Sequence, residues 1–221
     1  MKKQKYNFFY RNGLSIAFLL LTLLSLSSQI YTGWKEHNEF LREYQQPGTS
    51  LSKYITSGHF IQATFENWES EFLQMALFVI FTIFLRQQGS SESKKCEDES
   101  IDPSDLIPKK DSPRAVKRGG IWLSFYKHSL SIALILLFLF SFMMHWYGSW
   151  LDYNEKQWLE HKGTEAFLPY ISNKKLWFES FQNWQSEFLS IFTIIFLSIY
   201  LRQIGSSQSK PVNAPHTETG E

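Results

Sequence analysis

The chain carries one pattern twice, and this duplication constrains the fold more than any other feature of the sequence. Residues 9–94 and 125–210 align without a gap at a constant offset of 116, and roughly a third of the aligned positions are identical. Asn-Trp-Glu-Ser-Glu-Phe-Leu at 67–73 returns as Asn-Trp-Gln-Ser-Glu-Phe-Leu at 183–189. A repeat of this kind predicts one supersecondary unit that is built twice.

Each copy contains two runs without a formal charge, at residues 14–31 and 72–85 and again at 130–150 and 188–201. About 20 apolar residues in a helix cross a bilayer core of about 30 Å. The shorter run of each copy follows a tryptophan and ends at an arginine, which favours anchoring at both interfaces. The predicted fold is an all-α membrane protein with four transmembrane helices, built from two tandem parallel two-helix repeats.

The repeat also sets the predicted boundaries. Repeat 1 covers residues 1–94, with spans at about 13–34 and 68–86; repeat 2 covers residues 121–210, with spans at about 129–150 and 184–202.

Polar composition predicts a disordered cytoplasmic linker at residues 95–120 and a disordered tail at 211–221. The basic start of the chain, followed by an apolar run, resembles a secretory signal peptide. Because the same run recurs in mid-chain, we expect the first copy to be retained as a transmembrane helix.

Basic residues divide unevenly between the two sides of the predicted membrane. The termini and the linker hold 15 of the 22 Lys and Arg residues, and the loops near 35–71 and 151–187 hold the other seven. Since Lys and Arg concentrate in cytoplasmic segments, both termini are predicted to be cytoplasmic. The two copies then share one orientation, as repeats related by an axis along the membrane normal do. Aromatic residues within 51–65, and their counterparts in the second copy, predict interfacial helices in the outer loops.

Polar residues recur at helical spacing where each second span begins. Asn67, Glu71 and Gln74 share one helix face, and the second copy repeats this with Asn183, Glu187 and Ser190. Carboxylates within a membrane are costly unless they are paired or face water. We therefore predict a polar or ion site, for a divalent cation or for proton exchange, formed by Glu71, Glu187, Asn67, Asn183, Gln29 and His145. The alternative is that these residues cap helices and hydrogen-bond between them.

Other residues indicate structural roles. Arg86 and Arg202 are predicted to be cytoplasmic anchors, with Gly89 and Gly205 as helix-stop residues. Cys96 is the only cysteine, so an intrachain disulfide is excluded. The sequence contains neither a glycine-rich phosphate loop nor the metal and nucleophile motifs His-Glu-x-x-His, Cys-x-x-Cys and Gly-x-Ser-x-Gly. No catalytic residue and no cofactor is predicted, and which metal the site would hold stays open.

Asn-Trp-x-Ser-Glu-Phe-Leu at 67–73 and 183–189, with Leu-Arg-Gln-x-Gly-Ser-Ser at 85–91 and 201–207, resembles an uncharacterised family of bacterial membrane proteins. This family is catalogued as domain of unknown function 6766, and the resemblance covers nearly the whole chain. It implies a bacterial inner-membrane protein, with no assigned reaction, ligand or catalytic residue.

The function predicted from these observations is that of an integral inner-membrane protein, non-enzymatic, acting through helix packing and protein or lipid contacts. The alternative is a small oligomeric ion or solute transporter or channel that uses the repeated polar stripe. Expected partners are membrane lipids and either a second copy of the chain or another membrane protein. Nucleic acid is not expected as a partner, because basic residues are spread through the cytoplasmic flanks.

Overall fold

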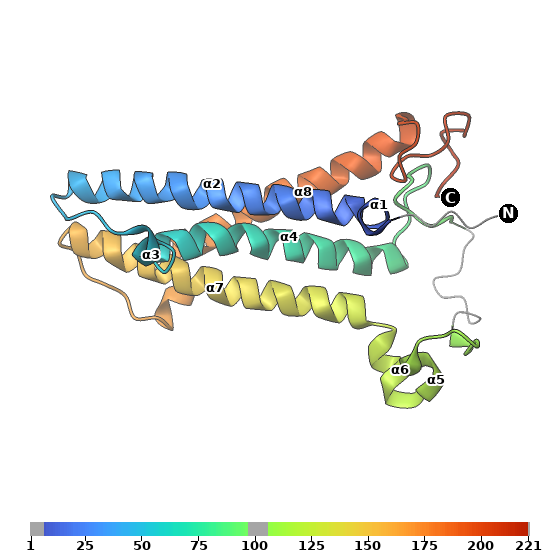
Figure 1. The fold of residues 1–221 in the computed structure, drawn as a ribbon, viewed down its shortest axis with the longest axis horizontal. Coiled ribbons are helices and arrows are strands. Elements are labelled where there is room, and N and C mark those ends of the chain that lie inside the picture. Colours follow the sequence, from blue (N-terminus) through green and yellow to red (C-terminus); the bar gives the residue numbers. More distant parts are fainter. Residues whose placement is uncertain (1–6, 97–105, 221) are drawn as a thin grey trace. The chain divides into compact units, whose positions relative to one another are not determined.

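A computed structural model describes residues 7–96 and 106–220, and within these ranges every regular element is helical (Figure 1). This confirms the predicted all-α class. The elements are α1 (Phe8–Arg11), α2 (Gly13–Glu43), α3 (Leu51–Tyr54), α4 (Gly58–Phe84), α5 (Arg114–Arg118), α6 (Gly120–Tyr126), α7 (Ser129–Leu159), the 3₁₀ helix η2 (Pro169–Ser172) and α8 (Lys174–Tyr200).

The two long helix pairs have matching bounds. α2 and α7 are both 31 residues long, and α4 and α8 are both 27 residues long. In each pair the second helix begins 116 positions after the first. α2 and α7 are long and apolar enough to cross a membrane. None of the apolar 18-residue window of α2 is buried within the protein, and only 17% of that of α7 is. These two helices therefore expose their apolar surface instead of forming the core of a soluble domain.

The chain divides into two compact units. Unit 1 contains residues 1–63 and 147–167, and unit 2 contains residues 64–146 and 168–221, so α4 and α7 each contribute to both. Their described parts are treated separately below.

In unit 1, glycines allow the first turn of α4 to approach the last turns of α7. A Cβ atom at Gly58 would lie 2.3 Å from the backbone nitrogen of Asp152, and one at Gly148 would lie 2.4 Å from that of Gln62. Only residues without a Cβ allow such contact between backbones. This contact lies near the start of α4, which begins at Gly58, ten residues before the span predicted from about 68.

The predicted interfacial helix at 51–65 is divided in the structure. α3 ends at Tyr54, and the following turn leads directly into α4. The Ser57 hydroxyl accepts a hydrogen bond from the Phe60 backbone N–H at 3.3 Å, which satisfies one of the unpaired donors at the start of α4. Most of the aromatic segment is thus the first part of α4.

The connections that follow α2 and α7 in unit 1 are closed by the same hydrogen bonds. The indole N–H of Trp34 donates to the Thr49 carbonyl at 2.8 Å, while the Asn38 amide donates to that carbonyl and accepts from the Thr49 N–H. The same three bonds recur 116 positions later, at Trp150, Asn154 and Glu165. Backbone groups in these connections are therefore satisfied by side chains of the preceding helix.

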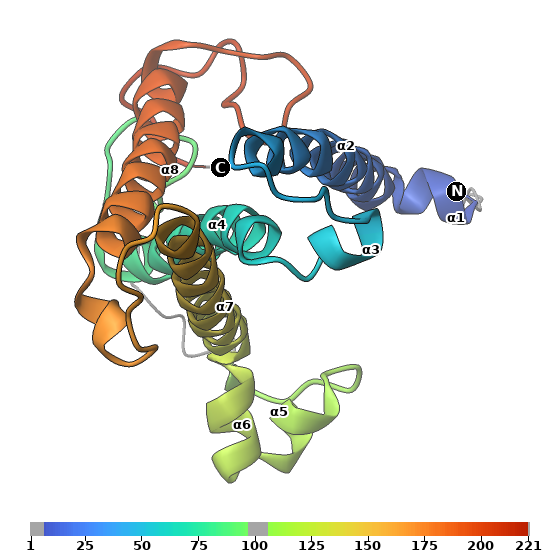
Figure 2. The same ribbon diagram turned by 90° about the vertical axis from the view of Figure 1, so that its left-hand side faces the viewer.

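Unit 2 packs α4, the first half of α7 and α8 against one another (Figure 2). Phe65 of α4 contacts Phe140 of α7 edge to face, and Phe138 of α7 contacts Trp184 of α8. Between α4 and α8, the Gln74 amide donates to the Ser190 hydroxyl at 3.3 Å. The partners in this last bond occupy positions 116 residues apart.

α4 ends at Phe84 and α8 at Tyr200, before the predicted anchors Arg86 and Arg202. Each arginine donates to three carbonyls near its helix end, at Thr82, Ile83 and Leu85 and at Ser198, Ile199 and Leu201. The arginines thus satisfy carbonyls that have no partner within the helix. Gly89 and Gly205, with φ of +86° and +81°, lie beyond the helix ends, in turns that favour glycine.

The segments predicted to be disordered form hydrogen bonds and a short helix where they are described. In the tail, the Lys210 ammonium donates to three backbone carbonyls, and Thr219 accepts a 2.8 Å hydrogen bond from the Gly89 N–H. α5 lies within the predicted linker, whose residues 97–105 are outside the described part of the chain. These side chain to backbone bonds satisfy carbonyl groups of the tail.

Candidate functional site

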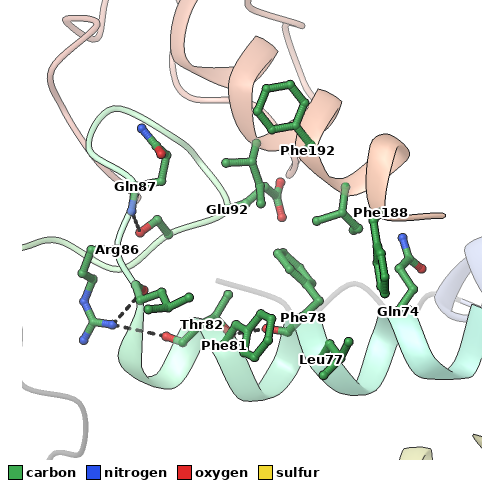
Figure 3. Close-up of a pocket in the computed structure, with 14 residues that line it drawn as sticks. Gln74, Leu77, Phe78, Phe81, Thr82, Arg86, Gln87, Glu92, Phe188 and Phe192 are labelled. Carbon is green, nitrogen blue, oxygen red and sulfur yellow. Dashed lines mark hydrogen bonds between the residues drawn. The ribbon is translucent and has the colours of Figure 1, made fainter. Parts of the chain in front are cut away.

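Unit 2 contains an apolar cavity between α4 and α8, with a volume of about 620 Å³. Figure 3 shows Phe78 and Phe81 of α4 and Phe188 and Phe192 of α8 among its lining residues. Glu92, in the loop after α4, also lines the cavity, and burial raises the pKa of this carboxyl although a hydrogen bond from Ser91 opposes the shift. The lining favours an apolar occupant, such as a lipid chain or a partner's side chains, over a polar substrate.

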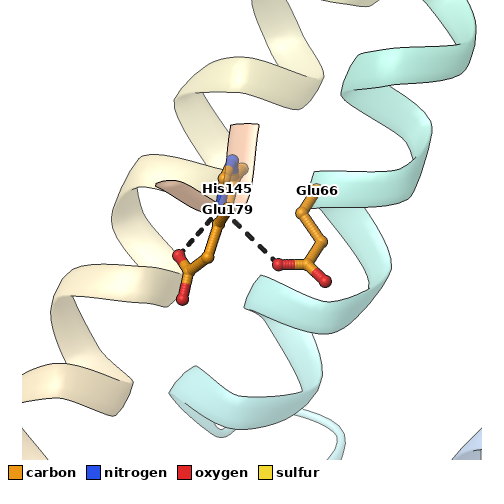
Figure 4. A group of neighbouring side chains, drawn as sticks. All are labelled: Glu66, His145 and Glu179. Atoms are coloured by element: carbon orange, nitrogen blue, oxygen red, sulfur yellow. Dashed lines mark hydrogen bonds and ion pairs between the residues drawn. The ribbon is translucent and has the colours of Figure 1, made fainter. Parts of the chain in front are cut away.

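The second feature of unit 2 is a group of charged side chains, here called the His145 cluster. Its five members come from three helices: Glu66 and Glu69 from α4, His145 from α7, and Lys175 and Glu179 from α8. Figure 4 shows Glu66, His145 and Glu179 pointing toward one another.

The imidazole of His145 is surrounded by carboxylates. Its Nδ1 lies 2.6 Å from Oε2 of Glu69, and its Nε2 lies 3.3 Å from Oε2 of Glu179 and 3.8 Å from Oε2 of Glu66. The side chains of His145 and Glu69 are 0% exposed. Both ring nitrogens face acceptors, so the neutral ring alone cannot satisfy the arrangement. It requires a doubly protonated ring, a protonated carboxyl group or a cation beside the unprotonated nitrogen.

Two further side chains hold the carboxylates in place. The indole N–H of Trp184 donates to Oε1 of Glu69 at 2.8 Å, and the Lys175 ammonium lies 2.5 Å from Oε1 of Glu179. Charge-assisted bonds of this kind are stronger than neutral ones. Glu69 is therefore fixed on both oxygens, one toward Trp184 and the other toward His145.

The residues predicted from the sequence fall into different places. His145 is in the cluster, whereas Glu71 and Glu187 interact with each other elsewhere between α4 and α8. The side-chain amide of Asn183 donates to the backbone carbonyl of Glu179, and the backbone carbonyl of Asn67 accepts from the Ser70 hydroxyl. Gln29 belongs to unit 1. The structure thus brings the two predicted glutamates together, but not around His145.

The sequence prediction missed Glu66, Glu69 and Glu179. That prediction followed polar residues that recur in both copies, and these three do not recur: their counterparts at an offset of 116 are Gln182, Gln185 and Ala63. The counterpart of His145 is Gln29. The available signal was therefore a set of positions at which one copy is ionisable and the other neutral.

The chain belongs to the family described as Domain of unknown function (DUF6766), which matches residues 5–221. This confirms the resemblance found in the sequence. No curated protein and no solved structure matches the chain.

Proposed function

We propose that this member of the DUF6766 family is a non-enzymatic, four-span protein of the bacterial inner membrane, acting through helix packing and contacts with lipids or other membrane proteins. The observation that carries the proposal is the exposed apolar surface of α2. Seven large side chains along the 11 residues 14–24 of this helix are each at least half exposed: Leu14, Phe18, Leu19, Leu20, Leu21, Leu23 and Leu24.

Such a surface is unfavourable in water. Full burial of one large apolar side chain contributes about 1.5–3 kcal/mol, and soluble monomers rarely expose contiguous apolar patches of more than a few hundred Å². α7 repeats the pattern, with Leu136, Leu139, Phe140 and Met143 each about half exposed. Lipid is the solvent that removes this penalty for both helices.

α4 and α8 are proposed as the other two spans, at about residues 68–86 and 184–202. Each helix has 27 residues, or about 40 Å at 1.5 Å per residue, which exceeds the hydrocarbon thickness. Their charged residues lie in the first halves, and the second halves are free of charge up to the arginines. Polar contacts such as Gln74 to Ser190 are of the kind that joins helices within membranes.

The two-helix repeat is proposed to place both copies in one orientation, with both termini and the linker in the cytoplasm. Excess Lys and Arg in those segments supports this orientation. The pairs Gln74–Ser190 and Glu71–Glu187 also support it, because contacts between equivalent positions are expected where a pseudo-twofold axis passes between two helices. The apolar cavity between α4 and α8 suits a lipid chain or a partner helix.

Single-cysteine labelling in intact cells tests the proposal. Cys96 is exposed in the linker and reports on one side of the membrane; Ser52→Cys and Lys162→Cys, made in a Cys96→Ser background, report on the two outer connections. A membrane-impermeant maleimide is expected to label the outer positions in intact cells, and Cys96 only after the cells are permeabilised. Equal labelling of Cys96 and the outer positions in intact cells, or release of the chain from membranes by carbonate, would contradict the proposal.

A further inference from the structure

We propose that Glu66, His145 and Glu179 bind one divalent transition-metal ion of the zinc class, with Glu69 as the residue that positions His145. This goes beyond the proposed membrane function, and it uses carboxylates other than the Glu71 and Glu187 pair predicted from the sequence.

The spacing of the three ligand atoms fits such an ion. Nε2 of His145 and one carboxylate oxygen each of Glu66 and Glu179 all lie within 4.8 Å of one another, with 3.3 and 3.8 Å from the nitrogen to the two oxygens. Zinc bonds of about 2.0–2.2 Å in a tetrahedron separate neighbouring ligands by about 3.3–3.6 Å. The two nitrogen–oxygen distances are close to this range, and the oxygen–oxygen distance, within 4.8 Å, would reach it if each carboxylate shifted by roughly half an ångström.

The surroundings of His145 also match those of a metal ligand. Histidine ligands commonly donate their second ring N–H to a carboxylate, which fixes the tautomer and aims the other nitrogen at the metal. Here Nδ1 lies 2.6 Å from Glu69, whose other oxygen accepts from Trp184 at 2.8 Å. Nε2 is thereby left directed toward Glu66 and Glu179.

Charge balance favours a bound cation. With Glu66, Glu69 and Glu179 ionised and Lys175 protonated, a doubly protonated His145 leaves these five side chains with a net charge of −1. A divalent ion with neutral His145 brings the same group to zero. Uncompensated charge is costly where side chains are withdrawn from water, as His145 and Glu69 are.

The donor set selects the kind of metal. One imidazole nitrogen with two carboxylate oxygens suits zinc and its first-row neighbours, whereas calcium takes six to eight oxygen ligands and Cu(I) prefers sulfur. Three protein ligands leave a fourth position for water or another ligand.

Competition against a chromophoric zinc chelator tests the proposal, using full-length protein purified in detergent and first stripped of metal. We expect one Zn²⁺ per chain. Glu69→Gln should weaken binding roughly 10–100-fold, the range for residues that orient a ligand, while Glu66→Gln with Glu179→Gln should weaken it further. The matched control is Glu71→Gln with Glu187→Gln, which removes the same number of carboxylates from the same two helices and should leave the affinity unchanged.

Absorption of Co²⁺ bound to the wild-type chain gives a readout that does not depend on whether variants fold. Intense visible bands of four- or five-coordinate Co²⁺ are expected, and added Zn²⁺ should displace them. The proposal is overturned if wild-type protein binds neither ion stoichiometrically. It is also overturned if the Glu71/Glu187 variant loses as much affinity as the Glu66/Glu179 variant, or if His145→Gln leaves the Co²⁺ spectrum unchanged.

Discussion

Three residues of the His145 cluster differ from their counterparts, 116 positions away, in charge but not in polarity. Glu66, Glu69 and His145 correspond to Gln182, Gln185 and Gln29. Glu69 and His145 are fully buried against each other, whereas Gln182 and Gln185 are exposed. Glutamine retains hydrogen-bonding capacity without ionising. Glu66 and Glu69 lie in the first copy and His145 lies in the second, so the charges gather between the two copies, and the neutral counterparts direct attention to what these charges do there.

The hydrogen bonds that shape each copy behave differently, because they recur. Trp34 and Trp150 each donate to a backbone carbonyl in the following connection at 2.8 Å. Ser70 and Ser186 each donate to the carbonyl three residues earlier, at 2.9 and 2.8 Å. Bonds found in both copies support the two-helix unit, whereas the His145 cluster joins residues of the first copy to residues of the second.

The largest effect is expected from His145→Gln, which places the counterpart residue in the cluster. Without the imidazole, Glu66, Glu69 and Glu179 lose their shared partner, and the metal-free protein should lose about 3–5 kcal/mol in unfolding free energy. Denaturant unfolding in detergent measures this. Gln182→Ala, at the exposed counterpart of Glu66, should change stability by less than about 0.5 kcal/mol. Equal losses of unfolding free energy in the two variants would show that the cluster is no more important for stability than its counterpart positions.

A smaller difference is expected between Trp184→Phe and Trp68→Phe, which change equivalent positions. Phenylalanine keeps much of the ring packing, but at Trp184 it removes the donor to the buried Glu69 carboxylate, at a cost of about 1–3 kcal/mol. Trp68 is 38% exposed, and its replacement should cost less than about 1 kcal/mol. Thermal unfolding of both variants measures the two losses of stability. Trp184→Phe is expected to lose more than Trp68→Phe, and the opposite result would contradict this expectation.

Equal effects are expected where the copies share a bond. Trp34→Phe and Trp150→Phe each remove one indole hydrogen bond to a carbonyl, so each should cost about 1 kcal/mol. Losses of unfolding free energy that differ by more than about twofold between the two variants would show that the two connections are not energetically equivalent.

The smallest effect concerns alkaline pH and Tyr54 in unit 1. Burial, with the nearby Glu36 and Asp152 carboxylates, raises the pKa of Tyr54 to about 12. Because the folded protein resists losing this proton, Tyr54 stabilises it below pH 10, and that contribution declines as pH rises from about 10 to 12. The stability difference between wild-type protein and Tyr54→Phe should therefore stay constant from pH 7 to 9 and shrink above pH 10. A stability difference that grows above pH 10 would contradict a raised pKa of Tyr54 in the folded protein.

Much of the fold could be predicted from the distribution of charge. The charge-free runs at 14–31 and 130–150 lie in α2 and α7, and the all-helical class follows from them. α4 and α8 begin about ten residues before the predicted spans, and these first turns are polar and depend on local contacts. At α8, for example, the Asn173 side chain accepts from the Lys175 N–H at 2.9 Å.

The candidate site was predicted only in part, for a geometric reason. Glu69 and Glu71 are two residues apart on one helix, which places them about 160° apart around its axis. Glu71 faces Glu187, while Glu69 reaches His145. Sequence periodicity groups residues that share a face, but it does not tell which face meets α7. The recurrence of Glu71 in both copies therefore favours it in a prediction from sequence, although Glu69 is the buried partner of His145.

X-ray absorption at the zinc edge tests the central claim, that the His145 cluster holds a metal ion. In zinc-loaded wild-type protein we predict a first shell of nitrogen and oxygen at about 2.0–2.1 Å with the outer-shell scattering of one imidazole. That imidazole signal should vanish in His145→Gln and persist in the Glu71/Glu187 variant. A wild-type spectrum without imidazole scattering, or one that His145→Gln leaves intact, would contradict the account.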